Sequence, residues 1–460
     1  MQEILHSTTE ALTSESTEFK REIGVFGGVS IIGGIMIGSG IFYLGAYVLE
    51  RVQMNSGLAL LAWIIGGLIT LFGGLCYAEL GAAMPVAGGR VVYLNEAFHP
   101  VVGFMSGFTD WLIGGPGSVA ALAIALTTVF KSFIPISDFG IKMAAITLII
   151  LLTVLNLRGV KLASSIQNIS MVGKLLPILL IMFAALFVGK VSPDLSLTST
   201  TTSSPTSLIS MIAFAVVASL WAYEGWTNLN TVAEEIREPH KNLPLALVIG
   251  IGGIMVLYTL FNYAIMRVLP HEQIVAMITS GDLYLGTAVA ESVFGSVGKV
   301  IVSLGMILAM FGSTNGLILA QPRMYYAMAQ EGHFFKAFSK LHPKYKVPTA
   351  PLIVQAVFSI ILVLMRNLDQ LTNMVVITGM IFSVLTILSV PRLRKKYPTI
   401  HRPFKIWFYP VSVIITALIF TGLVIQAAIE DPVTGITGLV VPLLGAVTFF
   451  IFDKQRKEQV

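Results

Sequence analysis

Residues 33–42 read Gly33-Gly34-Ile35-Met36-Ile37-Gly38-Ser39-Gly40-Ile41-Phe42, a cluster of small residues inside a long apolar run. A second such stretch is Trp221-Ala222-Tyr223-Glu224-Gly225-Trp226. In a bilayer every backbone polar group must be satisfied within the protein, so a helix that breaks at mid-membrane needs an explanation. The two stretches fall in the first and sixth apolar runs, which are corresponding positions if the first ten runs form two halves of five. Paired interruptions of this kind indicate the binding site of a transporter.

The composition predicts an all-α integral membrane protein. Hydrophobic residues make up 55% of the 460 residues, charged residues make up only 12%, and the mean hydropathy is +0.84. A membrane helix needs about 20 mostly apolar residues, and such runs recur along the whole chain. We expect one transmembrane domain over 1–460 with twelve spans near 24–49, 57–84, 96–130, 141–157, 163–189, 208–232, 243–268, 297–329, 350–366, 370–390, 407–429 and 434–452.

The distribution of cationic residues predicts the orientation. With the N-terminus inside, 21 Lys and Arg residues fall on the cytoplasmic side and 7 outside, and Lys174 remains within a span. Short cytoplasmic loops carry such an excess. We therefore expect cytoplasmic tails at 1–23 and 453–460 and multiple passes through the plasma membrane. Residues 190–207 and 269–296 are expected outside, the first without regular structure and the second with small helices.

A broken helix offers its free N–H groups to a carboxylate and its free carbonyls to an ammonium. An α-amino acid carries both groups, so the two breaks favour such a substrate. The alternative is that the glycines serve only the close packing of helices, which is common in membranes.

Four charged residues lie within the expected spans, where charge is costly and usually functional. Glu79 is close to the end of its span, so a pairing with loop residues is favoured. Asp110 is expected to pair with another helix. Lys174 lies about two turns inside the fifth span, where its ammonium could neutralise carbonyls of a broken helix. Glu224 lies within the second interruption and is a candidate for the site by position.

Several kinds of site have no signal in the sequence. No nucleotide-binding, hydrolase or zinc motif occurs, so we expect no catalytic residue, no cofactor and no metal. The single cysteine, Cys76, excludes an internal disulfide. Scattered basic residues in short loops do not indicate a nucleic-acid partner; the expected partners are an amino acid and the lipid bilayer.

The motifs resemble those of the L-type amino acid transporters within the amino acid–polyamine–organocation superfamily, over most of the chain. The first, Gly38-Ser39-Gly40-Ile41-Phe42, is similar to that family's unwound first helix. Three further motifs follow in the family's order: Tyr77-Ala78-Glu79-Leu80 with Pro85, Gly88-Gly89 and Tyr93; Trp221 to Trp226 with Asn228, Asn230, Glu234-Glu235, Pro239 and Asn242-Leu243-Pro244; and Asn315-Gly316 with Arg323, Tyr325-Tyr326, Ala329 and Glu331-Gly332-His333. Within the family, the sequence resembles the bacterial alanine–serine–cysteine exchangers.

The resemblance implies a LeuT-type five-plus-five inverted repeat with discontinuous helices 1 and 6. The repeats would cover 24–190 and 208–390, followed by two extra helices at 407–452. It implies that Ser39 and Gly40 bind the substrate carboxylate, and that Met36, Trp221 and Glu224 offer carbonyls to its ammonium. Trp221 would also be the outer gate, and Lys174 would stand where sodium-coupled relatives bind a cation.

The family mostly exchanges neutral amino acids without sodium, so we expect a sodium-independent exchanger of small neutral L-amino acids in a bacterial membrane. Animal members join a heavy subunit through a cysteine in an outside loop, but residues 131–140 contain none, so no covalent subunit is expected. Glu224 leaves open the acceptance of cationic amino acids, and a proton-coupled symporter remains an alternative. A membrane-embedded enzyme would need a nucleophile–base pair or metal cluster within the spans, and a receptor would not need paired breaks.

Overall fold

The computed structural model describes residues 12–13, 17–42, 44–130, 134–198, 205–280, 284–366, 368–430 and 432–457. The regular structure in these ranges is helical, and an isolated β-bridge joins Ile23 to Ile236. The elements in chain order are α2 Val25–Met36, η1 Ser39–Phe42, α3 Leu44–Arg51, α4 Ser56–Ala83, α5 Arg90–Ala97, α6 Pro100–Thr109, η2 Asp110–Gly114, α7 Gly115–Val129, α8 Asp138–Leu157, α9 Val160–Val188, α10 Pro205–Ala222, η4 Trp226–Glu235, α11 Pro239–Val268, α12 His271–Thr279, α13 Leu285–Phe294, α14 Ser296–Gln330, η5 Lys336–Ser339, α15 Thr349–Met365, α16 Leu368–Lys396, α17 Val411–Glu430 and α18 Pro432–Lys457.

Six of the described helical stretches are long and apolar enough to cross a membrane, judged by length and composition. They are Ser56–Ala83, Pro100–Val129, Asp138–Leu157, Val160–Val188, Pro239–Val268 and Ser296–Gln330. Large apolar side chains such as Leu176 and Phe183 of α9 are exposed on the outside of the bundle. In water such side chains would be unfavourable, whereas lipid tails accommodate them at no cost.

The structure interrupts the helices at both glycine-containing stretches found in the sequence. In the first, α2 ends at Met36, and the short helix η1 leads into α3 from Ser39 onward. In the second, α10 ends at Ala222, and η4 begins at Trp226 after Gly225, whose φ is +118°. Each of these two predicted spans is therefore a pair of half-helices with backbone groups exposed between them.

The third predicted span, 96–130, begins too early. Residues 90–97 form the separate helix α5, and a new helix begins at Pro100 with His99 as its N-cap. Proline at the first helical position lacks the N–H that an interior position would require, so it favours a start there. The span proper is thus α6, the π-helical turn η2 and α7.

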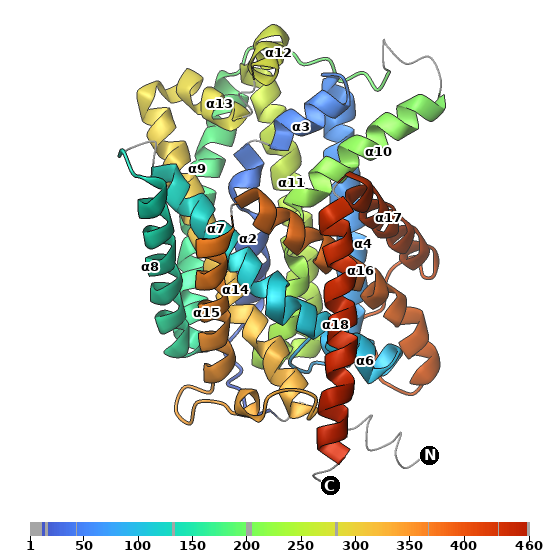
Figure 1. Ribbon diagram of the computed structural model, residues 1–460. Coiled ribbons are helices and arrows are strands. Elements are labelled where there is room, and N and C mark those ends of the chain that lie inside the picture. Colours follow the sequence, from blue (N-terminus) through green and yellow to red (C-terminus); the bar gives the residue numbers. More distant parts are fainter. Residues whose placement is uncertain are drawn as a thin grey trace.

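The helices form one bundle with two distinct ends (Figure 1). The small helices α12 and α13, expected from residues 269–296, lie at the upper end in the figure, and the last turns of α18 lie at the lower end. Residues 190–198 have no regular structure, as expected, and 199–204 lie outside the described residues. The expected irregular loop 190–207 extends too far, because α10 already begins at Pro205, a residue that favours the first helical position.

At the lower end the segment before α2 is joined to the end of η4. The Ile23 N–H donates to the Glu235 carbonyl at 2.9 Å, and the Arg237 N–H donates to the Ile23 carbonyl at 2.8 Å. The Glu235 carboxylate accepts from Arg323 of α14 at 2.5 and 3.2 Å, and both side chains are 1% exposed. These contacts hold the lower ends of α2, η4 and α14 together.

Candidate functional site

Lys174 of α9 occupies the first break. Its ammonium donates to the carbonyls of Gly33, Gly34 and Ile37 at 2.7, 2.8 and 2.8 Å, and its side chain is fully buried. Gly33 and Gly34 lie in the last turn of α2 and Ile37 is its C-cap residue, so a positive charge here complements the helix dipole. Of the three carbonyls, that of Gly33 also accepts from the Ile37 N–H at 3.0 Å. Lys174 therefore ties the broken end of α2 to α9 through its own ammonium.

Ser313 of α14 contacts the same turn. Its hydroxyl lies 2.6 Å from the Gly34 carbonyl and 3.2 Å from that of Ile35. On α9 the Gln167 amide donates to the Ser30 carbonyl at 3.1 Å. A side chain on Gly34 would collide with Gln167, so this glycine also serves close packing. The two explanations of the glycine cluster, a break and small-residue packing, are both realised here.

Tyr258 of α11 joins the two breaks, and sequence reasoning missed it. Its hydroxyl donates toward the Met36 carbonyl at 2.9 Å and the Ala222 carbonyl at 3.2 Å, the last residues of α2 and α10. The ring is fully buried against Trp63 and Tyr223. The carbonyl ends of two half-helices thus converge on one hydroxyl donor. A buried tyrosine hydroxyl usually finds a partner, but nothing in the sequence says which.

The other residues expected to bind substrate lie beside this convergence. The η1 helix begins at Ser39, so the N–H groups of Ser39 and Gly40 have no acceptor within that helix. The Ser39 side chain and the Trp221 side chain lie outside the described residues, so the expected outer gate is not described. The Trp221 backbone lies in the last turn of α10.

Glu224 lies between the half-helices of the second break and is partly buried. Gly225 follows it, and a side chain there would place Cβ 2.5 Å from Cγ2 of Ile35 in α2. The positive φ and this close approach both require glycine. The Asn228 amide donates to the Gly225 carbonyl at 3.1 Å, which steadies the turn. Glu224 is thereby held next to the first break.

The remaining two intramembrane acids are paired and do not reach the first break. Glu79 of α4 accepts from Arg394 at 2.7 and 2.6 Å and from the Ile406 N–H at 2.8 Å. It joins α4 to α16 and the segment after it, as the pairing interpretation expected. Asp110 pairs with Arg90 of α5, and both side chains are largely buried.

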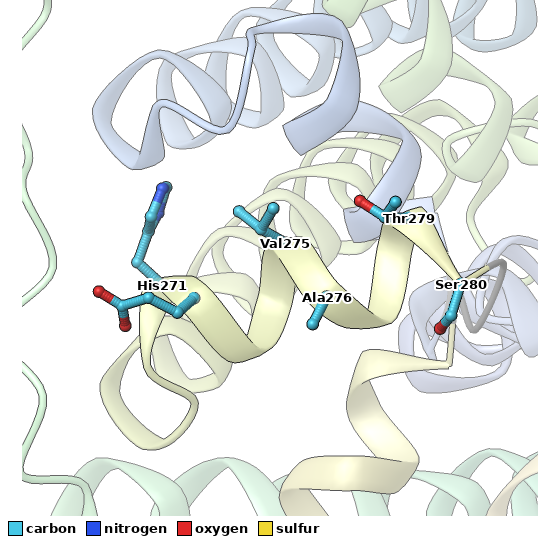
Figure 2. Close-up of a pocket in the computed structure, with 6 residues that line it drawn as sticks. His271, Val275, Ala276, Thr279 and Ser280 are labelled. Carbon is cyan, nitrogen blue, oxygen red and sulfur yellow. The ribbon is translucent and has the colours of Figure 1, made fainter.

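A surface hollow of about 590 Å³ lies at the upper end and is separate from these groups (Figure 2). Its lining residues all come from α12 and its C-cap: His271, Glu272, Val275, Ala276, Thr279 and Ser280. Because a single helix cannot enclose a ligand, this hollow is an open surface depression. Among the described residues no group of three His, Cys, Asp or Glu side chains could hold a metal, and Cys76 is buried in α4.

The sequence of the chain is similar to those of known membrane proteins. The model of the family described as "Amino acid permease" matches residues 23–451. The chain is 30% identical to the serine/threonine exchanger SteT of Bacillus subtilis over 447 residues, covering 96% of this chain and 99% of that protein. It is 32% identical to the Asc-type amino acid transporter 1 of Mus musculus, covering 95% and 82%, and 29% identical to the mouse b(0,+)-type amino acid transporter 1, covering 97% and 90%.

Proposed function

Since the chain belongs to the amino acid permease family and is an amino acid transporter, we propose that it is a sodium-independent exchanger of small neutral L-amino acids. The observation that carries this proposal is the convergence of two helix breaks, one of which is filled by an internal ammonium. The resemblance to an exchanger named for serine and threonine, and to an Asc-type transporter, supports the small neutral class.

The substrate would bind at the convergence of the breaks. Its carboxylate would accept from the N–H groups of Ser39 and Gly40 at the start of η1. Its ammonium would bind carbonyls at the two breaks, those of Met36, Trp221 and Glu224. Because the Met36 carbonyl already accepts from Tyr258 and from the Gly38 N–H, the ammonium would compete with the Tyr258 hydroxyl. Substrate binding would then weaken the hydrogen bond from the Tyr258 hydroxyl to the Met36 carbonyl.

Lys174 supports exchange rather than coupling to an ion gradient. A sodium-coupled transporter needs an external cation to bind carbonyls of the broken first helix, whereas here a covalently attached ammonium makes three such bonds. A charge that never leaves the protein contributes no driving force. Transport would then depend on substrate on the opposite side, which is the behaviour of an antiporter.

The fold proposed with this function is the five-plus-five inverted repeat. The first repeat, 24–190, would begin with the broken helix α2–α3, and the second, 208–390, with the broken helix α10–η4. The α17 and α18 helices would be the two extra spans, giving twelve in all. The lower end of the bundle in Figure 1, where the last turns of α18 lie, would be cytoplasmic, because the excess of Lys and Arg in the sequence assigns both tails to that side. With Cys76 buried, no covalent subunit is proposed.

One observation favours a second candidate, an exchanger that also accepts cationic amino acids. Glu224 lies within the break that would bind substrate, and an anionic side chain there attracts a cationic one. Proton-coupled symport remains the other alternative.

Counterflow in proteoliposomes tests the proposal. Vesicles containing purified protein are preloaded with unlabelled serine or left empty, and uptake of labelled serine is measured. Exchange predicts uptake into preloaded vesicles well above that into empty ones, unchanged when choline replaces sodium. Equal uptake into both would contradict exchange, and uptake that follows an imposed pH gradient would support the symport alternative.

A further inference from the structure

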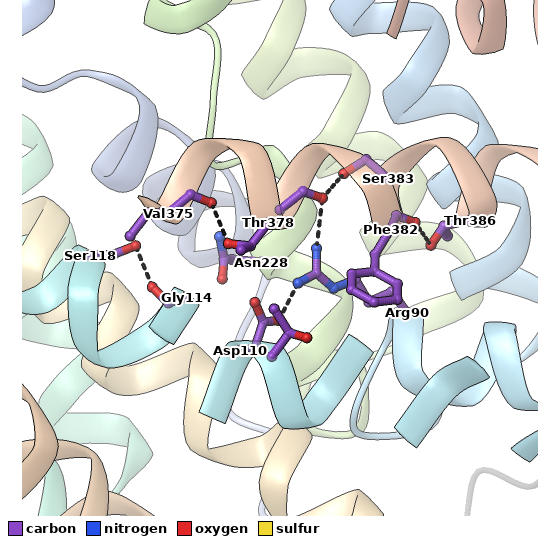
Figure 3. A network of polar contacts seen from close by, with 12 residues as sticks. Arg90, Asp110, Gly114, Ser118, Asn228, Val375, Thr378, Phe382, Ser383 and Thr386 are labelled. Carbon is purple, nitrogen blue, oxygen red and sulfur yellow. Dashed lines mark hydrogen bonds and ion pairs between the residues drawn. The ribbon is translucent and has the colours of Figure 1, made fainter. Parts of the chain in front are cut away.

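Helix α16 turns one face toward the interior of the bundle. On this face Thr378 and Thr386 are buried, and the Arg90 guanidinium lies 6.0 Å from the centre of the Phe382 ring (Figure 3). One terminal nitrogen of Arg90 also lies 3.5 Å from the Gly379 carbonyl. Because a helix turns once every 3.6 residues, these contacts decide which residues of α16 face outward.

The outward face of α16 carries an apolar side chain and then two cations. Leu388 is exposed, and so are Arg392 and Lys395, which follow it by four and seven residues. Residues at this spacing share one face of a helix. The two cations lie about 6 and 10 Å beyond Leu388 along the helix axis. A surface that suits lipid tails therefore continues directly into a cationic surface.

The other cations of this segment are bound by protein groups. Arg394 pairs with Glu79 at 2.6 Å, and Lys396 pairs with Glu96 at 3.0 Å. Arg402 donates to three main-chain carbonyls at 2.9 to 3.0 Å. The two acids near the end of α16 are thus already neutralised.

Arg392 and Lys395 have no such partner. Within the part of the chain that the structure describes, neither side chain makes an ion pair. The Arg392 guanidinium lies 3.9 Å above the ring of Phe98, the C-cap residue of α5. Stacking on a ring holds the guanidinium plane and leaves its N–H groups free at the edge. An arginine held in this way can bind a phosphate through two parallel hydrogen bonds.

Aromatic side chains show where these cations lie relative to the membrane. Trp407, Phe408 and Tyr409 precede α17 and are all exposed, and such residues are typical of the membrane–water interface. The Arg394 guanidinium lies 3.8 Å above the Tyr409 ring. Because Arg392 precedes Arg394 by two residues, it lies only about 3 Å away along the helix axis. Arg392 is therefore at the level of the lipid headgroups.

We propose that Arg392 and Lys395 form a binding site for the headgroup of an anionic phospholipid. The lipid phosphate would accept from the stacked Arg392 guanidinium, and the Lys395 ammonium would add to the attraction. The acyl chains would lie along the apolar face of α16 that includes Leu388. A zwitterionic headgroup carries its own cation, so it would bind more weakly. None of the groups proposed to bind substrate lies on α16, so this site is separate from the transport site.

The test is binding of phosphatidylglycerol to the purified protein in detergent, with phosphatidylcholine as the neutral comparison. Native mass spectrometry counts the bound lipid, and the thermal midpoint is followed as lipid is added. The main variant is Arg392→Gln with Lys395→Gln. We expect wild type to prefer phosphatidylglycerol, and the variant to lose about fivefold in affinity for it per cation removed, or about 25-fold in all. The preference of wild type should shrink as the salt concentration rises.

Lys336→Gln with Lys340→Gln is the matched control. It removes two exposed cations from the segment between α14 and α15, which the distribution of Lys and Arg assigns to the same side of the membrane as the end of α16. Its affinity for phosphatidylglycerol should equal that of wild type. Lys395→Gln alone, which changes one exposed side chain, should cost about fivefold and serves if the double variant does not fold.

Three results would each overturn the inference: equal binding of the two lipids to wild type, wild-type affinity in the variants of α16, or the same loss in the control. None of these measurements involves transport. The outcome for the lipid site is therefore independent of whether the protein proves to be an exchanger.

Discussion

Replacing Lys174 by methionine tests the role of the internal ammonium most directly. Methionine keeps an unbranched side chain of similar length and removes the charge and all three hydrogen bonds. We expect the variant to insert and fold, to bind substrate nearly as well as wild type, and to exchange it far more slowly. The reason is that Lys174 contacts the end of α2 and none of the groups proposed to bind substrate.

The size of the expected loss in exchange rate follows from the hydrogen-bond donors that each of the three carbonyls keeps when Lys174 is replaced. The Gly33 carbonyl still accepts from the Ile37 N–H at 3.0 Å, and the Gly34 carbonyl still accepts from Ser313 at 2.6 Å. Only the Ile37 carbonyl loses its sole described partner. One buried carbonyl left unsatisfied costs about 1–3 kcal/mol. If turnover requires this arrangement, the exchange rate should fall by about 5- to 150-fold.

Two measurements on the same preparation separate the roles. Counterflow of labelled serine gives the rate, and calorimetry gives the equilibrium affinity, which should change by less than about tenfold, or 1.4 kcal/mol. Ser313→Ala is the matched control, because it removes a neutral bond to the Gly34 carbonyl and should slow exchange less. Equal losses of rate and affinity, or wild-type exchange by Lys174→Met, would refute the reasoning.

Three further substitutions make distinct predictions. Gly40→Val should abolish substrate binding while the protein still inserts into the membrane, because the substrate carboxylate must approach the main chain. For the same reason amino acid methyl esters should fail to compete for binding to wild type, and competition by esters would contradict this. Gly225→Ala, which forces a Cβ onto positive φ and into α2, should lower the thermal midpoint and stop transport, whereas Gly252→Ala, with open space around it, should do neither. Arg323→Gln should destabilise the protein by about 3–5 kcal/mol, since it leaves Glu235 buried and unpaired. Adding Glu235→Gln should restore part of the lost thermal midpoint, and an unchanged midpoint in the single variant would argue against a tight pair.

Much of the helical layout could be predicted from the sequence, because lipid allows few alternatives to apolar helices. The breaks were predictable for the same reason, since glycine clusters and charges at mid-membrane are rare without a purpose. Lys174 stood out as a cation deep in a span, and its depth pointed to carbonyl partners. The substrate-binding roles of Met36, Ser39, Gly40, Trp221 and Glu224 remain predictions, and the side chains of Ser39 and Trp221 lie outside the described residues.

The convergence of the breaks could not be predicted from the residues alone. Tyr258 is one of several tyrosines in apolar runs, and only the packing of α11 against α2 brings its hydroxyl to the carbonyls of Met36 and Ala222. The pairing of Arg90 with Asp110 joins the start of α5 to the start of η2, and the sequence indicated only that Asp110 would pair with another helix, not which one.

The bridge between Ile23 and Ile236 consists of main-chain atoms, and this has a consequence for how such transporters diverge. Any residue but proline supplies the same N–H and carbonyl, so mutation of either side chain leaves the bridge in place. Relatives could share this fastening with no residue in common there, and an alignment would show only unremarkable variation. A proline at position 237, which would remove the N–H that bonds to Ile23, is the kind of change that would cut it. The main-chain bridge that joins the start of α2 to the end of η4 can therefore be conserved in structure while the residues that form it vary in sequence.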